Sequence, residues 1–142
     1  MLGPYAWGAK SRARLDTCHP LLVLLFDRVI RRSGLRHDLT VVYGVRTKAE
    51  QDALVAKGAS RLRWPKSRHN ATPSLAVDVV PFVGGKPDPK TWAHFHAVAP
   101  SIKAEWLRMC VEGVVPDGVT LEWGGDWRGF PDGAHWQLNG IG

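Results

Sequence analysis

The sequence has few of the features that mark secreted, membrane-spanning or disulfide-stabilised proteins. Its 142 residues contain two cysteines, Cys18 and Cys110, which are too few for a disulfide framework and too far apart for a Cys-x-x-Cys metal site. We therefore expect both to be buried thiols. The apolar run at residues 21–26 is far shorter than the roughly 20 residues that cross a bilayer, so we expect no stable membrane insertion.

We also expect no signal peptide, because residues 1–10 contain no charged segment followed by an apolar run. We expect the chain to be made in the cytoplasm, so that any target outside the cell requires a separate route of export. Residues 1–14 include several small and polar residues, with glycine at positions 3 and 8. This composition predicts a loosely held N-terminal arm.

Acidic residues are outnumbered by basic ones, 13 against 19, which gives a formal net charge of +6. A basic surface attracts polyanions such as nucleic acid, anionic lipid, or wall polymers with their phosphates and carboxylates. No nucleic-acid-binding motif is present, so we expect no nucleic-acid partner. A hydrophobic content of 44% and a length of 142 residues are typical of a single globular domain, residues 1–142.

Helical and extended patterns alternate irregularly along the chain, which predicts an α+β fold with a small, largely antiparallel sheet and flanking helices. Thr47 and Glu50 have the spacing of a capping box at the start of one helix. The expected helices span residues 20–32, 48–57 and 91–111, the last broken at Pro100, and the expected strands span residues 39–43, 76–80, 120–123 and 134–138.

One carboxylate, Asp78, lies in a run of small and β-branched residues that reads as a buried strand. A buried carboxylate is unfavourable unless it is paired or bound to a metal. His69 precedes it across a proline-containing loop, and His135 lies in the last expected strand. Two imidazoles and one carboxylate suit Zn²⁺ with one position left open, which is a catalytic pattern.

Four other histidines compete for this role. His19 and His37 lie at helix ends with no carboxylate partner in the pattern. His94 and His96 form a His-x-His pair, but on a helix of about 3.6 residues per turn they point apart. We therefore expect none of the four to bind the metal.

Hydrolysis at such a site also requires a general base. Asp132 lies three residues before His135, which places it near the metal without making it a ligand. Asp126 and Glu122 are carboxylates in the same region, and residue spacing alone does not decide among the three.

Four motifs, taken in order, resemble the zinc D,D-carboxypeptidase family and most closely its bacteriophage branch, the L-alanyl-D-glutamate endolysins. The similarity extends from about Leu15 to Leu138, although the loop of eight residues between His69 and Asp78 is longer than in many members. The motifs are Tyr43-Gly44-Val45-Arg46-Thr47-x-Ala49-Glu50-Gln51, Ser67-x-His69-Asn70 with Pro73-Ser74-x-Ala76-x-Asp78, Trp123-Gly124-Gly125-Asp126-Trp127, and Asp132-x-x-His135-x-Gln137-Leu138.

The resemblance implies the fold of these D,D-peptidases, which hedgehog domains share, with zinc held by His69, Asp78 and His135. The family's acid-x-x-His spacing matches Asp132 alone, which implies that Asp132 is the catalytic base. Further substrate-binding roles are expected for three residues. Arg46 is expected to hold a substrate carboxylate, Ser67 to contact substrate or its own loop, and Trp123 to form a wall of the cleft.

The implied activity is hydrolysis of the peptidoglycan stem peptide, at the L-alanyl-D-glutamate bond. A D,D-carboxypeptidase that releases terminal D-alanine and an inactive wall-binding or phage structural protein are the alternatives. We expect no separate wall-binding domain within the 142 residues. We expect a monomer, made in the host cytoplasm and acting at the wall, whose export depends on another protein such as a holin.

Overall fold

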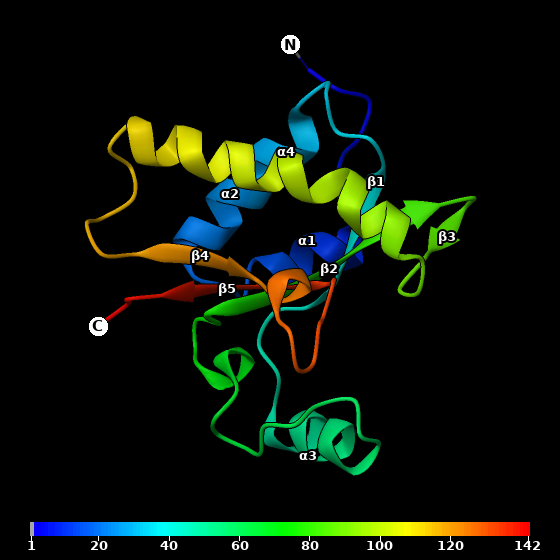
Figure 1. Ribbon diagram of the computed structural model, residues 1–142, viewed down its shortest axis with the longest axis vertical. Coiled ribbons are helices and arrows are strands. Elements are labelled where there is room, and N and C mark those ends of the chain that lie inside the picture. The colour runs from blue at the N-terminus through cyan, green and yellow to red at the C-terminus, as the bar shows by residue number, and fades with distance from the viewer. Residues whose placement is uncertain (1) are drawn as a thin grey trace.

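Five antiparallel strands form one sheet at the centre of the computed structural model, which describes residues 2–142 (Figure 1). This arrangement, with helices around a small antiparallel sheet, confirms the expected α+β class. Along the sheet the order is β1 (Asp38–Tyr43), β2 (Ala76–Val83), β5 (His135–Asn139) and β4 (Thr120–Trp123), and β3 (Lys86–Pro87) pairs with the end of β2.

Four helices flank the sheet, and the bounds are α1 (Ala9–Leu15), α2 (Pro20–Arg31), α3 (Lys48–Ala56) and α4 (Trp92–Val111). Helices α2 and α4 pack together on one side of the sheet, while α3 and the loop after it form the lower part of the molecule (Figure 1). Among residues 2–142, no helix has both the length and the apolar composition needed to cross a membrane.

Local sequence signals explain where two of the helices begin. The ring Nδ1 of His19 accepts a hydrogen bond from the backbone N–H of Leu21 at 3.1 Å, and a proline occupies the first turn of α2. At α3 the expected capping box is formed, because the Thr47 hydroxyl accepts from the Glu50 N–H and the Glu50 carboxylate accepts from the Thr47 N–H.

The N-terminal segment is more ordered than its composition predicted. Residues 9–15 form α1, and Leu15 at its end is fully buried. The Ser11 hydroxyl accepts a hydrogen bond from the Val41 N–H at 3.1 Å, which ties α1 to β1. The prediction of a loosely held arm at residues 1–14 is therefore wrong for residues 9–14, which are helical. Met1 lies outside the described residues.

Helix α4 is also continuous where a break was expected. Pro100 removes one backbone donor, but it lies on the exposed side of the helix, while Val98, Ala99 and Ile102 are buried around it. Packing on both sides of the proline therefore holds the helix together.

The cysteines differ from each other. Cys18 is buried, and burial raises its thiol pKa to about 12, whereas Cys110 is exposed on α4. Both are free, so the expectation of a buried thiol holds for Cys18 and is wrong for Cys110.

A buried carboxylate joins α2 to α4. The side chain of Glu105 has no exposed surface, and the guanidinium groups of Arg28, Arg32 and Arg108 all bind it. Burial raises the pKa of Glu105, but the hydrogen bonds and charges of Arg32 and Arg28 lower it further, so the carboxylate stays ionised.

Candidate metal centre

Strand pairing places Asp78 beside His135. The two residues are direct partners across the antiparallel ladder between β2 and β5. Directly opposite residues in such a ladder point to the same face of the sheet with their Cβ atoms about 5 Å apart. The two side chains therefore meet because the strands pair in this register.

His69 reaches the same point from the loop before β2. It lies in η1, a short 3₁₀ turn spanning Arg68–Asn70. The Ser67 hydroxyl accepts from the His69 N–H at 3.2 Å, and the Asn70 side-chain oxygen accepts from the Ser67 N–H at 3.1 Å. This reciprocal capping fixes the turn, so the long loop brings His69 back over Asp78.

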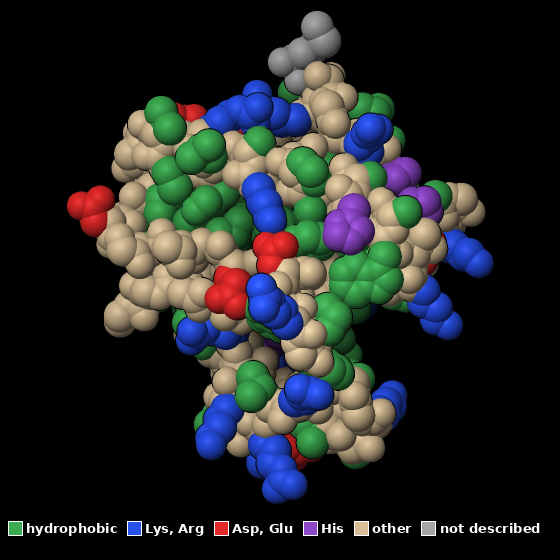
Figure 2. Space-filling model, in the orientation of Figure 1, with side chains coloured by type: hydrophobic (Ala, Val, Ile, Leu, Met, Phe, Trp, Pro, Cys, Tyr) green, Lys and Arg blue, Asp and Glu red, His purple; other side chains and the backbone are tan. Residues whose placement is uncertain are grey.

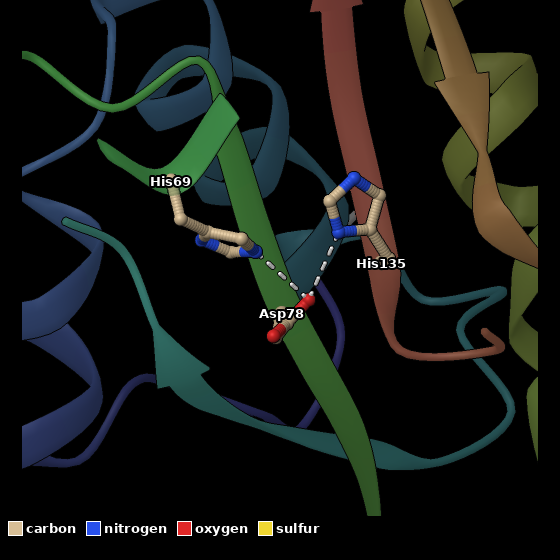
Figure 3. Close-up of side chains that lie close together, drawn as sticks. All are labelled: His69, Asp78 and His135. Atoms are coloured by element: carbon tan, nitrogen blue, oxygen red, sulfur yellow. Dashed lines mark hydrogen bonds and ion pairs between the residues drawn. The ribbon is translucent and has the colours of Figure 1, made fainter. Parts of the chain in front are cut away.

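Both imidazoles point at one carboxylate oxygen (Figure 3). His69 Nε2 lies 3.2 Å and His135 Nδ1 lies 3.4 Å from Asp78 Oδ1, and the three candidate ligand atoms lie within 4.8 Å of one another. All three residues are buried, with exposed fractions of 0% for His69, 6% for Asp78 and 7% for His135. The set expected from the sequence is therefore assembled in the structure.

The outer ring nitrogen of each histidine is bound to an acceptor. His69 Nδ1 lies 2.8 Å from the carbonyl oxygen of Gly44, and His135 Nε2 lies 2.9 Å from the side-chain oxygen of Gln137. Because both partners are oxygens that accept, these nitrogens donate. With its proton on this outer nitrogen, each neutral ring would present the lone pair of its other nitrogen to a metal ion bound beside Asp78.

The chemistry of this donor set fits a cation. Burial raises the pKa of Asp78, but the charge of His69 and hydrogen bonds from both histidines lower it well below its usual range. Burial lowers the pKa of His135, yet its hydrogen bond to Asp78 raises it further. Asp78 therefore stays ionised, and an ionised carboxylate between two imidazoles is a donor set that suits a divalent metal ion.

Gly44 cannot carry a side chain at the position that orients His69. A Cβ atom there would lie 2.2 Å from the Thr17 hydroxyl oxygen and 2.3 Å from the Arg14 carbonyl oxygen. The close approach of this turn to α1 thus requires glycine, and it places the carbonyl group that binds His69 Nδ1.

Arg46 binds Asp78. Its Nη2 donates to Asp78 Oδ2 at 2.5 Å, its Nη1 donates to Gln51 Oε1 at 3.4 Å, and its guanidinium lies 4.5 Å from the centroid of the Tyr43 ring. Arg46 is 8% exposed, and its Nε has no partner among residues 2–142. The guanidinium expected to hold a substrate carboxylate is therefore engaged with the protein's own carboxylate.

A cavity of about 250 Å³ lies beside the candidate ligands, and His69 and His135 are in its lining. The loop after α3 and the loop before β5 contribute to its walls, and the predicted residues Arg46, Ser67, His69, Asp132 and His135 all line it. The other residues that line it are Ala59, Ser60, Arg61, Leu62, Arg68, Trp127, Phe130 and Gln137.

Trp123 is absent from these walls. It is 5% exposed, its Nε1 donates to the carbonyl oxygen of Gly133 at 2.8 Å, and its ring stacks on Trp136 with centroids 5.5 Å apart. The expectation that Trp123 forms a wall of the cleft does not fit this position. Trp127 has that place instead, with its ring 4.9 Å from that of His135.

Asp132 lines the cavity, and Gly124 holds its backbone. The Asp132 N–H donates to the Gly124 carbonyl oxygen at 2.9 Å, and a Cβ atom on Gly124 would lie 2.5 Å from the Asp132 carbonyl oxygen. Burial and the charge of Asp78 raise the pKa of Asp132.

The two other candidate bases do not line the cavity. Asp126 is exposed and pairs with Lys103 at 2.9 Å, and the Glu122 carboxylate accepts a hydrogen bond from Trp127 Nε1.

The remaining histidines have other contacts. His19 caps α2, and the rings of His37 and His94 lie 4.8 Å apart, with His94 3.8 Å from Asp88. His96 lies on the same helix against Trp123. Within residues 2–142, His69, Asp78 and His135 are the one group of three side chains that converge for a metal.

Two glutamines support the site and were given no role in the sequence analysis. Gln51 is fully buried in α3 and accepts hydrogen bonds from Arg46 and Asn70. Gln137 orients His135. The position of Gln137 two residues after His135, on the same face of a strand, was a usable signal, whereas no local pattern connects Gln51 to the site.

Replacing Gln137 with leucine is expected to weaken metal binding. The His135 Nε2–H then loses its acceptor and the ring is free to change tautomer, a change that typically costs about 10–100-fold in metal affinity. Competition with a chelator followed by metal analysis measures this. Gln137→Glu, which keeps an acceptor oxygen, is the matched control, and equal zinc affinity in all three proteins would contradict the role.

Comparison with known proteins gives one consistent family. A family model described as phage L-alanyl-D-glutamate peptidase matches residues 4–137. The L-alanyl-D-glutamate peptidase of Escherichia phage T5 is 28% identical over 145 residues, which cover 94% of this chain and 98% of that protein. The crystal structure of the Serratia marcescens L-Ala D-Glu endopeptidase ChiX superposes with a TM-score of 0.72 at 30% identity, covering 92% of this chain and 87% of that one.

Proposed function

Since this chain belongs to the phage L-alanyl-D-glutamate peptidase family, we propose that it is a zinc-dependent endolysin that cuts the L-alanyl-D-glutamate bond of the peptidoglycan stem. The names of the phage T5 relative and of ChiX support the choice of bond. The observation that carries the proposal is the convergence of His69, Asp78 and His135 beside a cavity that His69, His135 and Asp132 line.

The proposed ligands of zinc are His69 Nε2, Asp78 Oδ1 and His135 Nδ1. Three protein ligands of these types are the set found in catalytic zinc sites. When bound there, zinc supplies a Lewis acid and a water whose pKa is about 7. The Gly44 carbonyl and Gln137 orient the two imidazoles for this purpose.

Asp132 is the proposed general base. Its carboxylate takes a proton as water attacks the L-alanine carbonyl carbon, and the carboxyl group then gives that proton to the departing amine of D-glutamate. Neither Asp126 nor Glu122 lines the cavity, and this supports the choice. The walls formed by Trp127 and Phe130 reduce access of bulk water to this exchange.

Arg46 and Ser67 are proposed to act on the protein's own ligands. Arg46 holds Asp78 Oδ2, so that Oδ1 stays directed at the two imidazoles. Ser67 holds the turn that carries His69. Arg46 thus orients the proposed ligand Asp78 and Ser67 orients the proposed ligand His69, as hydrogen-bonding residues around a metal site commonly do.

Charge on the surface is suited to an anionic wall. Figure 2 shows Lys and Arg side chains gathered on the lower part of the molecule, which contains α3 and the loop after it. The basic residues of this part are Lys48, Lys57, Arg61, Arg63, Lys66 and Arg68. Attraction between these charges and wall carboxylates is expected to weaken as salt rises.

Mass analysis of purified muropeptides tests the proposed function. After incubation with the zinc-loaded protein, we expect L-alanine to remain on the muramic acid and a new free amine to appear on D-glutamate. The same protein treated with a chelator is the control and should produce neither. Release of free D-alanine with the L-alanyl-D-glutamate bond intact would instead identify a carboxypeptidase.

A further inference from the structure

Three arginines line the cavity, and two of them are already occupied. Arg46 binds Asp78, and Arg68 Nη2 donates to the side-chain oxygen of Asn139 at 2.9 Å. The guanidinium of Arg61 has neither a hydrogen bond nor an ion pair with any side chain or carbonyl of residues 2–142. Of the three cavity arginines, Arg61 is therefore the one whose guanidinium N–H groups are all available to bind a ligand.

An aromatic ring holds this free guanidinium in place. Arg61 Cζ lies 4.7 Å from the centroid of the Phe130 ring. Stacking on a ring face uses the plane of the guanidinium and leaves the N–H groups at its edge free for a planar anion. Arg61 comes from the loop after α3 and Phe130 from the loop before β5, so their contact joins two segments of the cavity wall.

The residues on both sides of Arg61 are hydrogen-bonded to the buried Gln51. Gln51 Nε2 donates to the carbonyl oxygen of Leu62 at 2.6 Å and to the Ser60 hydroxyl at 2.9 Å. The other end of the same amide, Oε1, accepts from Arg46. Gln51 thus fixes Arg61 relative to the metal ligands, which lowers the entropy lost when a ligand binds.

The proposed substrate offers a matching anion next to the bond that is cut. Glutamate has one amine and two carboxyl groups. In the L-alanyl-D-glutamate unit the amine forms the scissile bond, and one carboxyl group at most continues the chain. The other remains a free carboxylate, whose two oxygens match the paired N–H groups of an arginine.

We propose that Arg61, stacked on Phe130, binds the free carboxylate of the D-glutamate residue and makes the enzyme selective for stems in which this group is not amidated. Arg61 is a specificity-determining residue in this scheme and takes no part in the proton transfers. The inference rests on the proposed function.

Two synthetic stem peptides test it, one with the free D-glutamate carboxylate and one with the corresponding carboxamide. The wild-type protein is expected to prefer the carboxylate peptide by about 10- to 100-fold in kcat/KM, the range for a hydrogen bond to a charged group. Arg61→Gln should lose this preference through a higher KM for the carboxylate peptide, while kcat and the rate on the carboxamide peptide stay unchanged. Arg63→Gln, at an exposed neighbour outside the cavity, is the matched control.

Other outcomes separate the two proposals. If the wild-type protein cuts neither peptide, the proposed function is wrong and this inference is wrong with it. If it cuts both equally, or if Arg61→Gln keeps the full preference, the function stands and the role of Arg61 is overturned. An equal loss on both peptides would show a structural role for Arg61, and a loss of preference in Arg68→Gln alone would assign the carboxylate to Arg68.

Discussion

Alanine in place of His69 or His135 is expected to remove bound zinc and peptidase activity together. Each substitution leaves two of the three ligands, and the water that zinc activates is lost with the metal. We expect about one zinc ion per wild-type chain, little in either variant, and a fall in activity of at least about 10³-fold. Atomic absorption on the purified proteins and clearing of a cell-wall suspension measure the two effects.

His96→Ala is the matched control, because His96 is exposed on α4 and does not line the cavity. It should keep both zinc and activity. Since His69 is fully buried, circular dichroism should confirm that its variant is folded. Full zinc occupancy in His135→Ala would show that the ligand set is wrong.

Asparagine in place of Asp132 is expected to separate metal binding from turnover. The side chain keeps its shape and its oxygen acceptor for the Ala134 N–H, which it now binds at 3.2 Å, but it no longer accepts a proton. Loss of general-base catalysis typically costs about 10²–10⁴-fold. Zinc content should therefore equal that of the wild type while kcat falls by this amount.

Asp126→Asn provides the comparison for this experiment. Asp126 is exposed and pairs only with Lys103 in the described residues, so its loss should leave kcat nearly unchanged. Normal turnover in Asp132→Asn together with an inactive Asp126→Asn would assign the base to Asp126.

The candidate metal site was predictable from the sequence because its side chains are unusual for their surroundings. A carboxylate in a buried strand requires a partner, and this requirement singles out Asp78 without any knowledge of the fold. His69 and His135 follow from their place beside strands that carry acids. The capping box of Thr47 and Glu50 was predictable for a different reason: both of its hydrogen bonds join residues three positions apart in the sequence.

The contacts around the ligands depend on the tertiary structure. Arg46 was expected to face substrate, but the turn after β1 brings its guanidinium against Asp78, which lies 32 residues further along the chain. Trp123 and Trp127 are the same residue type and lie four residues apart, so the sequence does not show which of them is buried. The path of the turn between them decides this. Two of the three arginines around Glu105 are likewise distant in sequence: Arg28 in α2 lies 77 residues away and Arg32 at the end of that helix lies 73 residues away.

The position of β5 has a consequence for the order in which the protein is made. This strand lies between β2 and β4, although it follows both in the chain. While a ribosome is still adding residues 135–139, β2 lacks its partner on that side, and His69 and Asp78 lack the third candidate ligand, His135. A nascent chain, or one cut short before residue 135, is therefore expected to be inert toward the wall, and activity begins only when the final strand enters the middle of the sheet.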